Sequence, residues 1–227
     1  MNVTDSSLIK ATAAATAVAG AIFIAVQINH PGANEFTTET SQWVARCSAK
    51  MVMAALALAG TTGLYLRQRR HLGLLGLAGY LLFAAGYLCM FAVEAIAVTV
   101  LPALVDSNPG FVNDVVAAAM GNHPSGDIGA TQTLFNASGI GYLLGGLVFG
   151  IAMFRARVLA RWAAALLAVA TVSTVALAFL PESFDRPFAI PTGIALIGLG
   201  VSLWRNPSDE TVAPAAAPAP VLEPAVR

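Results

Sequence analysis

Residues 72–101 read LGLLGLAGYLLFAAGYLCMFAVEAIAVTVL and contain one charged residue, Glu94. A transmembrane α-helix needs about 20 consecutive apolar residues, and this run is longer, so it predicts a membrane-spanning helix that tilts or projects beyond the bilayer. A carboxylate inside such a run is costly in hydrocarbon and usually faces a partner or a site. Glu94 is therefore the first candidate functional residue of the chain.

The composition of the whole chain is typical of an integral membrane protein. Hydrophobic residues make up 57% of the 227 residues, charged residues make up 11%, and the mean hydropathy is +0.74. Apolar runs predict membrane-spanning helices at 8–28, 43–66, 72–101, 131–154, 158–180 and 187–204. We therefore predict an all-α bundle of six transmembrane helices over residues 1–205, in a multi-pass protein of the cell membrane.

The charges in the connections predict the orientation of this bundle. Arginines gather between the second and third helices and between the fourth and fifth, whereas the alternate connections carry mostly acidic residues. An excess of Lys and Arg in short loops marks the cytoplasmic side of a membrane. Both termini are therefore expected to be cytoplasmic, and the long connection between the third and fourth helices is expected to be non-cytoplasmic.

Two segments outside the predicted spans have distinct compositions. In the long connection, FVNDVVAAAM (111–120) is predicted to form a short helix over the mouth of the bundle, with Gly121 ending it. Residues 206–227 are rich in Pro and Ala and lack an apolar period. They are predicted to form a disordered cytoplasmic tail.

Four aromatic residues share one face of the third predicted helix with Glu94. At 100° per residue, Tyr80, Phe83, Tyr87 and Phe91 fall within about 80° of arc that also holds Glu94. Aromatic rings stabilise a passing cation, and a carboxylic acid kept neutral by burial can donate a proton. This face suits acid-initiated carbocation chemistry on a lipophilic substrate. The alternative is that the rings fill the bundle interior and Glu94 pairs with a neighbouring helix.

The second predicted helix carries two cations, Arg46 and Lys50, one to two turns below its outer end. Lys50 and Glu94 lie at comparable depth, so an ion pair between them is predicted, and this pair would weaken the hypothesis of Glu94 as a proton donor. If both cations face inward, they form an anion site for a phosphate or a lipid head group. If they face outward, they snorkel to the membrane surface.

Further polar groups are expected in the same half of the membrane. Gln132 and Asn136 lie on one face of the fourth predicted helix and are candidates for orienting the acid or holding a water. Asp127 or Asp114 would supply a second carboxylate if the long connection folds over the mouth. Taken with Lys50 and Glu94, these residues predict a polar cavity that opens to the outside.

Small residues and cysteines have simpler interpretations. The pairs Gly141 with Gly145 and Gly146 with Gly150 match the small-xxx-small pattern and predict close helix packing. Cys47 and Cys89 differ in predicted depth by roughly 12 Å at about 1.5 Å of rise per residue, so no disulfide is expected and both are interpreted as buried small hydrophobes.

The motifs that the chain lacks exclude several function classes. It has no phosphate-binding Gly-Lys loop, no HExxH, no CxxC and no GxSxG. Its 12 basic and 12 acidic residues give zero net charge, which argues against a nucleic-acid partner. We expect no cofactor and no metal site, and we expect membrane lipid and a lipophilic small molecule as partners.

Three phrases carry a resemblance to a known group: GLLGLAGYLLFAAGYLCMF (73–91), GYLLGGLVFGIAMFRARVLARWAA (141–164) and LPESFDRPFAIPTGIALIGLGVSLWR (180–205). The chain resembles uncharacterised six-helix membrane proteins of actinobacteria over nearly all of residues 8–205, and this resemblance implies no function. In size and in its helix-embedded acid, the chain is also similar to small integral-membrane terpene cyclases. That similarity implies cyclisation of an isoprenoid, with Glu94 as the general acid.

Three functions therefore stand as hypotheses from the sequence. The first is a membrane-embedded enzyme that cyclises an isoprenoid by protonation. The second is a proton-coupled carrier or a lipid-binding membrane protein, and the third is an accessory membrane protein without catalysis.

Overall fold

The computed structural model describes residues 4–31, 36–178, 180 and 187–207, and within these ranges it is helical without strands. Its elements are α1 (Asp5–Ala25), α2 (Thr40–Thr99), α3 (Leu101–Leu104), α4 (Pro109–Ala119), α5 (Ala130–Ala156), α6 (Arg161–Ser173), the 3₁₀ helix η2 (Thr174–Ala178) and α7 (Ala189–Arg205). The all-α prediction is confirmed. Of the predicted tail, residues 208–227 lie outside the described residues.

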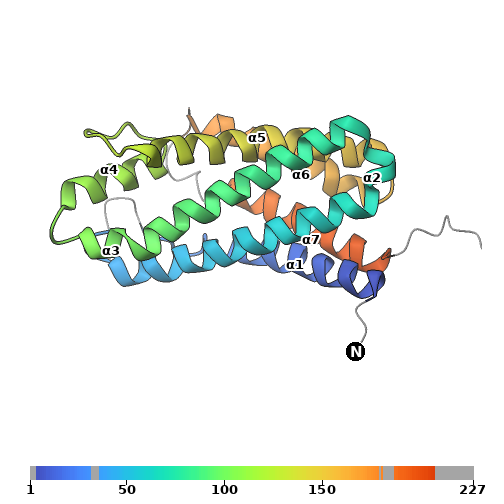
Figure 1. Cartoon of the computed structure of the whole chain (residues 1–227), viewed down its shortest axis with the longest axis horizontal. Helices are drawn as coiled ribbons and strands as arrows, with labels where there is room; N and C mark the ends of the chain where they lie inside the picture. Colours follow the sequence, from blue (N-terminus) through green and yellow to red (C-terminus); the bar gives the residue numbers. More distant parts are fainter. Residues whose placement is uncertain (1–3, 32–35, 179, 181–186, 208–227) are drawn as a thin grey trace, which may run out of the picture.

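Helix α2 is a hairpin of two antiparallel legs, which we call the first leg (40–72) and the second leg (74–99) (Figure 1). The chain reverses at Gly73, whose φ of 59° and ψ of −162° are non-helical and favour glycine. Across the hairpin, the rings of Tyr65 and Tyr80 stack with centroids 4.6 Å apart. The two legs correspond to the second and third predicted helices, so the described residues contain six long helical segments.

The connection between these two predicted helices is shorter than expected. Arg67, Arg69 and Arg70 are helical and extend the first leg to the turn at Gly73. Arginine and glutamine favour helix nearly as well as alanine does. The helix therefore continues beyond its apolar part, and the charged side chains lie on its last turns.

The six segments form a closed ring, and each segment packs against the two segments beside it. Helix α1 lies between α7 and α2, α5 lies between α2 and α6, and α6 also contacts α7. The predicted packing of glycines is confirmed, and each pair meets a different helix. Gly141 and Gly145 lie against Gly86 and Phe83 of the second leg, whereas Gly146 and Gly150 lie against α6.

Several helices have the length and hydropathy of membrane spans. Asp5–Ala25, Thr40–Leu104 and Ala130–Ala156 are long and apolar enough to cross a membrane, and the second of these ranges contains both legs of α2. Arg161–Leu177 and Ala189–Arg205 are shorter apolar helices. They occupy the positions of the spans predicted at 158–180 and 187–204, and part of the segment between them lies outside the described residues.

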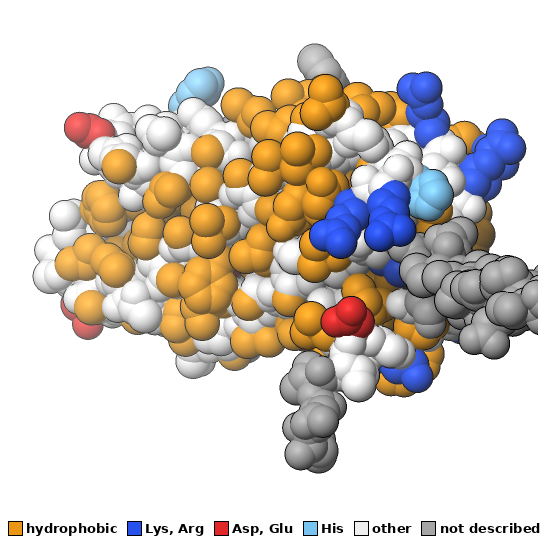
Figure 2. Space-filling view, turned by 45° about the vertical axis from the view of Figure 1, so that its right-hand side comes forward, with side chains coloured by type: hydrophobic (Ala, Val, Ile, Leu, Met, Phe, Trp, Pro, Cys, Tyr) orange, Lys and Arg blue, Asp and Glu red, His pale blue; other side chains and the backbone are white. Residues whose placement is uncertain are grey.

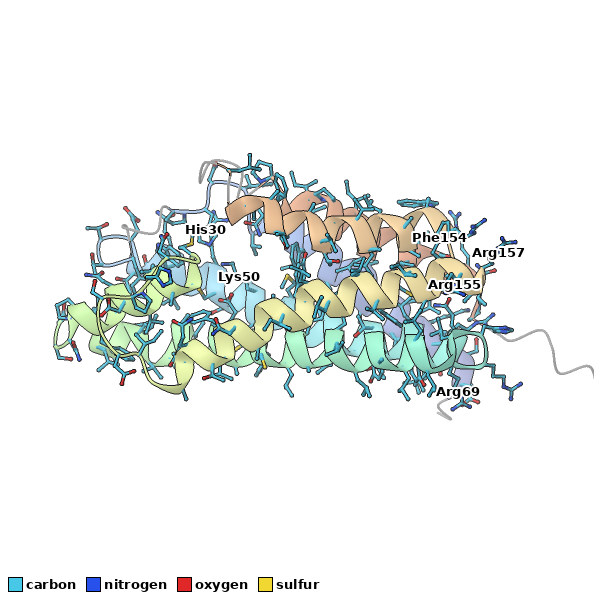
Figure 3. All side chains as sticks on the ribbon, turned by 90° about the horizontal axis from the view of Figure 1, so that it is seen from above. His30, Lys50, Arg69, Phe154, Arg155 and Arg157 are labelled. Carbon is cyan, nitrogen blue, oxygen red and sulfur yellow. The ribbon has the colours of Figure 1, made fainter. Side chains whose placement is uncertain are left out.

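Arginine side chains gather at one end of the bundle (Figure 3). Arg69, Arg155 and Arg157 lie at one end and His30 lies near the other (Figure 3). Lys and Arg side chains gather at one end of the face shown in Figure 2, and apolar side chains cover most of the remainder. Helix α1 begins and α7 ends at the basic end, where Arg67 Nε donates to the carbonyl oxygen of Asn206 at 2.8 Å.

The long connection between the second leg and α5 contains the predicted short helix. Helix α4 begins after Asn108, whose side-chain oxygen accepts a hydrogen bond from Phe111 N at 3.3 Å. It ends at Ala119 with Met120 as its C-cap, and Gly121, which has a φ of 79°, follows the cap. This left-handed residue is the helix stop that the sequence predicts.

Candidate functional site

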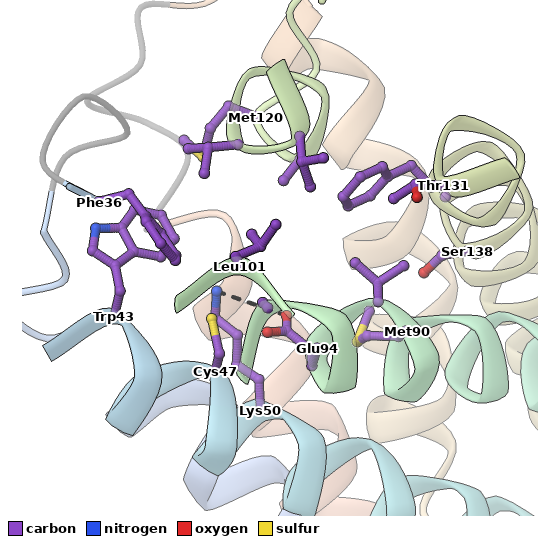
Figure 4. Close-up of a pocket in the computed structure, with 17 residues that line it drawn as sticks. Phe36, Trp43, Cys47, Lys50, Met90, Glu94, Leu101, Met120, Thr131 and Ser138 are labelled. Carbon is purple, nitrogen blue, oxygen red and sulfur yellow. Dashed lines mark ion pairs between the residues drawn. The ribbon is translucent and has the colours of Figure 1, made fainter. Parts of the chain in front are cut away.

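A cavity of about 300 Å³ lies between the two legs of α2, helix α4 and the first turns of α5 (Figure 4). Its walls are mostly apolar, and Val115, Val116 and Met120 of α4 and its C-terminal cap close one side. Val115 and Val116 belong to a buried cluster that also holds Trp43 and Leu101. Helix α4 therefore covers the cavity as the sequence predicts for the helix over the bundle mouth.

The polar part of the cavity wall is an ion pair between the two legs. Lys50 Nζ of the first leg lies 3.9 Å from Glu94 Oε1 of the second leg, and both residues line the cavity. Their side chains are 19% and 14% exposed, so the pair is largely removed from solvent. The structure thus places Lys50 and Glu94 together at the same depth, as the count of helix rise predicts.

A third side chain, Cys47, belongs to this polar group. It lies one turn before Lys50 on the first leg, lines the cavity, and points toward the Glu94 carboxylate (Figure 4). Cys47 and Cys89 are not joined by a disulfide, as predicted, and of the two only Cys47 is buried. Interpreting Cys47 as a small hydrophobe misses its orientation toward Glu94. Its spacing of three residues from Lys50 was the available signal, because it places both residues on one helix face.

The four aromatic residues predicted to surround Glu94 do not line the cavity. Phe83 and Tyr87 are fully buried in the main core, where both rings contact Tyr142. Tyr80 stacks on the first leg, and its hydroxyl is 3.1 Å from the Thr62 hydroxyl.

Phe91 is 37% exposed and lines a separate groove between α1 and α2. The four residues share about 80° of arc on their helix, but different parts of this arc face different neighbours. These neighbours are the first leg, α5 and the outer surface. The aromatic residues of the cavity are instead Phe36, Trp43 and Phe135, which come from other parts of the chain.

Arg46 and Lys50 point to different places. Arg46 Nη1 donates to the carbonyl oxygen of Val26 at 3.2 Å, at the C-terminal cap of α1. A cation at this position satisfies a terminal carbonyl and complements the helix dipole. The predicted anion site would need both cations in one cavity, and the structure does not bring them together, because the end of α1 holds Arg46.

The amides predicted near Glu94 lie outside the cavity. Gln132 Nε2 donates to Asn136 Oδ1 at 3.1 Å along the surface of α5, and Asn136 is exposed. Thr131 and Ser138 of the same helix line the cavity instead. The two amides therefore hydrogen-bond to each other and do not line the cavity of the Lys50–Glu94 pair.

The carboxylates of Asp114, in α4, and of Asp127 accept hydrogen bonds from the backbone of residues 125–129, which follow α4. Asp114 accepts hydrogen bonds from Ser125 N at 2.7 Å and from Gly126 N at 3.0 Å, and Asp127 Oδ1 accepts from Gly129 N at 2.7 Å. Neither carboxylate lines the cavity. Within the described ranges, no group of three or more His, Cys, Asp or Glu side chains is arranged to hold a metal ion.

Comparisons with known proteins give no indication of the function of this chain, so a proposed function has to come from the geometry of the cavity. No protein-family model, no curated protein and no solved structure matches the chain.

Proposed function

We propose that this protein is an integral membrane protein that binds a small amphiphilic molecule in the cavity beside Lys50 and Glu94. The observation that carries this proposal is the ion pair at 3.9 Å on a cavity wall whose other residues are mostly apolar. A charged pair that faces an apolar space costs free energy unless a polar group meets it. A molecule with one polar head and a short apolar body matches both parts of the wall.

The proposed membrane orientation follows from the charge distribution. With the basic end at the cytoplasmic face, Arg69, Arg155 and Arg157 lie on the side that the positive-inside rule assigns to them (Figure 3). The cavity then lies in the outer half of the bundle, under α4. A ligand would reach it from the outer leaflet or from the outer aqueous phase.

The size of the cavity limits the ligand. Ligand pockets commonly measure roughly 300–1,000 Å³, and this cavity of about 300 Å³ is at the lower end of that range. A single short alkyl chain with its head group fits, and a larger lipid would need displacement of α4.

Acid-initiated cyclisation of an isoprenoid remains a hypothesis with less support from the geometry. It needs aromatic rings around the developing cation and an acid that gives up its proton. Tyr80, Phe83 and Tyr87 are engaged in packing, and Glu94 faces an ammonium group. Binding of an amphiphile requires only that its polar head meet the Lys50–Glu94 ion pair, without proton transfer. Binding is therefore the better supported function.

The proposal is tested by thermal unfolding of the full-length protein in detergent with octanoate, octylamine or octanol. An amphiphile that binds the folded protein at 100 times its Kd stabilises it by about 2.7 kcal/mol. We expect stabilisation by at least one of these probes. The variant Ala97→Leu keeps both charges and fills part of the cavity, and we expect it to lose this stabilisation.

The matched control is Arg46→Met, which removes the neighbouring cation on the same helix but leaves the cavity wall intact. This variant should retain the full shift relative to its own baseline. Equal stabilisation of Ala97→Leu and of the unaltered protein would show that the amphiphile acts elsewhere, for example through the micelle, and would refute the proposed site.

A further inference from the structure

We propose that Cys47, Glu94 and Lys50 form an acyl-transfer site in this cavity, with Cys47 as the nucleophile toward an ester or thioester of a short acyl chain. This inference rests on the proposed function, because the acyl chain would occupy the amphiphile-binding cavity. It adds a covalent reaction, which binding alone does not require.

The argument begins with the three side chains that meet on one wall. Cys47 and Lys50 are three residues apart on the first leg, and Glu94 faces them from the second leg (Figure 4). The Cys47 side chain lies beside the Lys50 ammonium group and points toward the Glu94 carboxylate, and Lys50 Nζ lies 3.9 Å from that carboxylate (Figure 4). A nucleophile within hydrogen-bond reach of a base that a third group orients is the common arrangement of covalent catalysis.

This arrangement places Glu94 as a proton acceptor. The carboxylate oxygens accept hydrogen bonds and face an ammonium group, whereas the thiol has a proton to give. The role is the reverse of the proton donation that cyclisation requires. Lys50 serves as the orienting group and as a positive charge beside the reacting sulfur.

The reaction is balanced without a cofactor. Cys47 Sγ attacks the carbonyl carbon while its proton moves to Glu94, and the oxyanion that forms is stabilised by the Lys50 ammonium group. The bond from the acyl carbon to the leaving oxygen or sulfur breaks, and Glu94 returns the proton to the leaving group. Water then attacks the Cys47 thioester with Glu94 as the base, which releases a carboxylic acid and restores the thiol.

The cavity supplies the remaining requirement, a space with apolar walls for the acyl chain beside the sulfur. Met90, Leu101 and Phe135 line it together with the α4 valines. Cys89, the second cysteine, is half-buried on the second leg and does not line this cavity. It therefore provides an internal control, since it lies on the same hairpin without the carboxylate and the ammonium group.

The experiment incubates the full-length protein in detergent with 4-nitrophenyl octanoate and follows intact mass, nitrophenolate release and the acylated peptide. We expect one octanoyl group on the peptide that contains Cys47, removable by neutral hydroxylamine as a thioester is. Cys47→Ala and Cys47→Ser should lose it, and Cys89→Ala should keep the rate. Glu94→Gln should slow acylation by roughly 100-fold, the scale of general base catalysis.

Two outcomes would overturn the inference. One is acylation of Cys89 as fast as that of Cys47, and the other is a hydroxylamine-resistant adduct on Lys50 in place of the thioester. Thermal stabilisation by octanoate, octylamine or octanol, measured on the same preparations, separates this inference from the proposed function. Retained stabilisation without acylation refutes the acyl-transfer site alone, whereas loss of both refutes the binding cavity as well.

Discussion

The contact between α5 and the second leg of α2 gives a prediction whose size follows from the structure. A Cβ atom added at Gly145 would lie 2.3 Å from Phe83 N and 2.5 Å from Phe83 Cα. Ordinary van der Waals contacts begin near 3.4 Å, so in Gly145→Ala the new Cβ would lie about 1.1 Å too close to Phe83 N. The obstacle is backbone, which has no rotamer to change, so the two helices must separate.

The magnitude comes from a comparison within one helix. Overpacking of a close-packed contact costs about 1–3 kcal/mol, and replacing glycine by alanine inside a helix gains up to about 1 kcal/mol in propensity. Gly139 lies on the same helix, and a Cβ there meets nothing within 4 Å. Both substitutions gain propensity, so the difference between them isolates the steric cost, about 1–3 kcal/mol.

The assay is denaturation in mixed micelles with increasing SDS, followed by far-UV circular dichroism. Gly139→Ala should unfold at the same or a higher SDS fraction than the unaltered protein, and Gly145→Ala should unfold at a lower one. If the two variants are equally stable, the close approach of α5 to the second leg does not limit the packing, and the reasoning about this interface is wrong.

Three further perturbations are predicted to change the same SDS titration. Gly73→Ala should destabilise the hairpin by about 1–3 kcal/mol, because a φ of 59° with a ψ of −162° is a backbone conformation essentially restricted to glycine. Since no atom lies within 4 Å of its added Cβ, a larger loss would point to a cause other than conformation. Arg46→Met should lower the free energy of unfolding by about 0.3–1 kcal/mol, because it removes the hydrogen bond to the Val26 carbonyl at the end of α1. Hydrogen exchange should then become faster in the last turn of α1 but not in α5. Glu94→Leu should lower the free energy of unfolding by about 3–5 kcal/mol, because it leaves Lys50 without its partner. Adding Lys50→Met should recover much of this loss. A double variant that is less stable than either single variant contradicts the ion pair.

The helical elements and the glycine contacts could be predicted because they depend on local or near-local properties. Runs of about 20 apolar residues predict helices, and α4 is bounded by a capping Asn108 and by Gly121 at positive φ. Gly141 and Gly145 are spaced by four residues and therefore share a face, which is the pattern of close helix contact. The depth of Lys50 and Glu94 follows from the rise per residue, so their pairing was within reach of the sequence.

The composition of the cavity could not be predicted in the same way. The period of a helix places Tyr87, Phe91 and Glu94 on neighbouring arcs, but it does not say which neighbour each arc meets. In a helix that is apolar on all sides, amphipathic patterning does not separate core-facing from outward-facing positions. Phe91 consequently lies in an outer groove and Tyr87 in the core, while Phe36 and Phe135 reach the cavity from distant segments.

The amino-acid sequence by itself determined that this protein is a set of apolar helices with basic residues gathered in particular connections and one acid inside a long apolar run. Tertiary structure alone decided that Arg46 contacts the end of α1 whereas Lys50 turns to Glu94, and that Cys47 joins this pair on a cavity wall. The physical reason is that the distance along a helix is set by local geometry, whereas the partner of a side chain is set by which helix packs beside it.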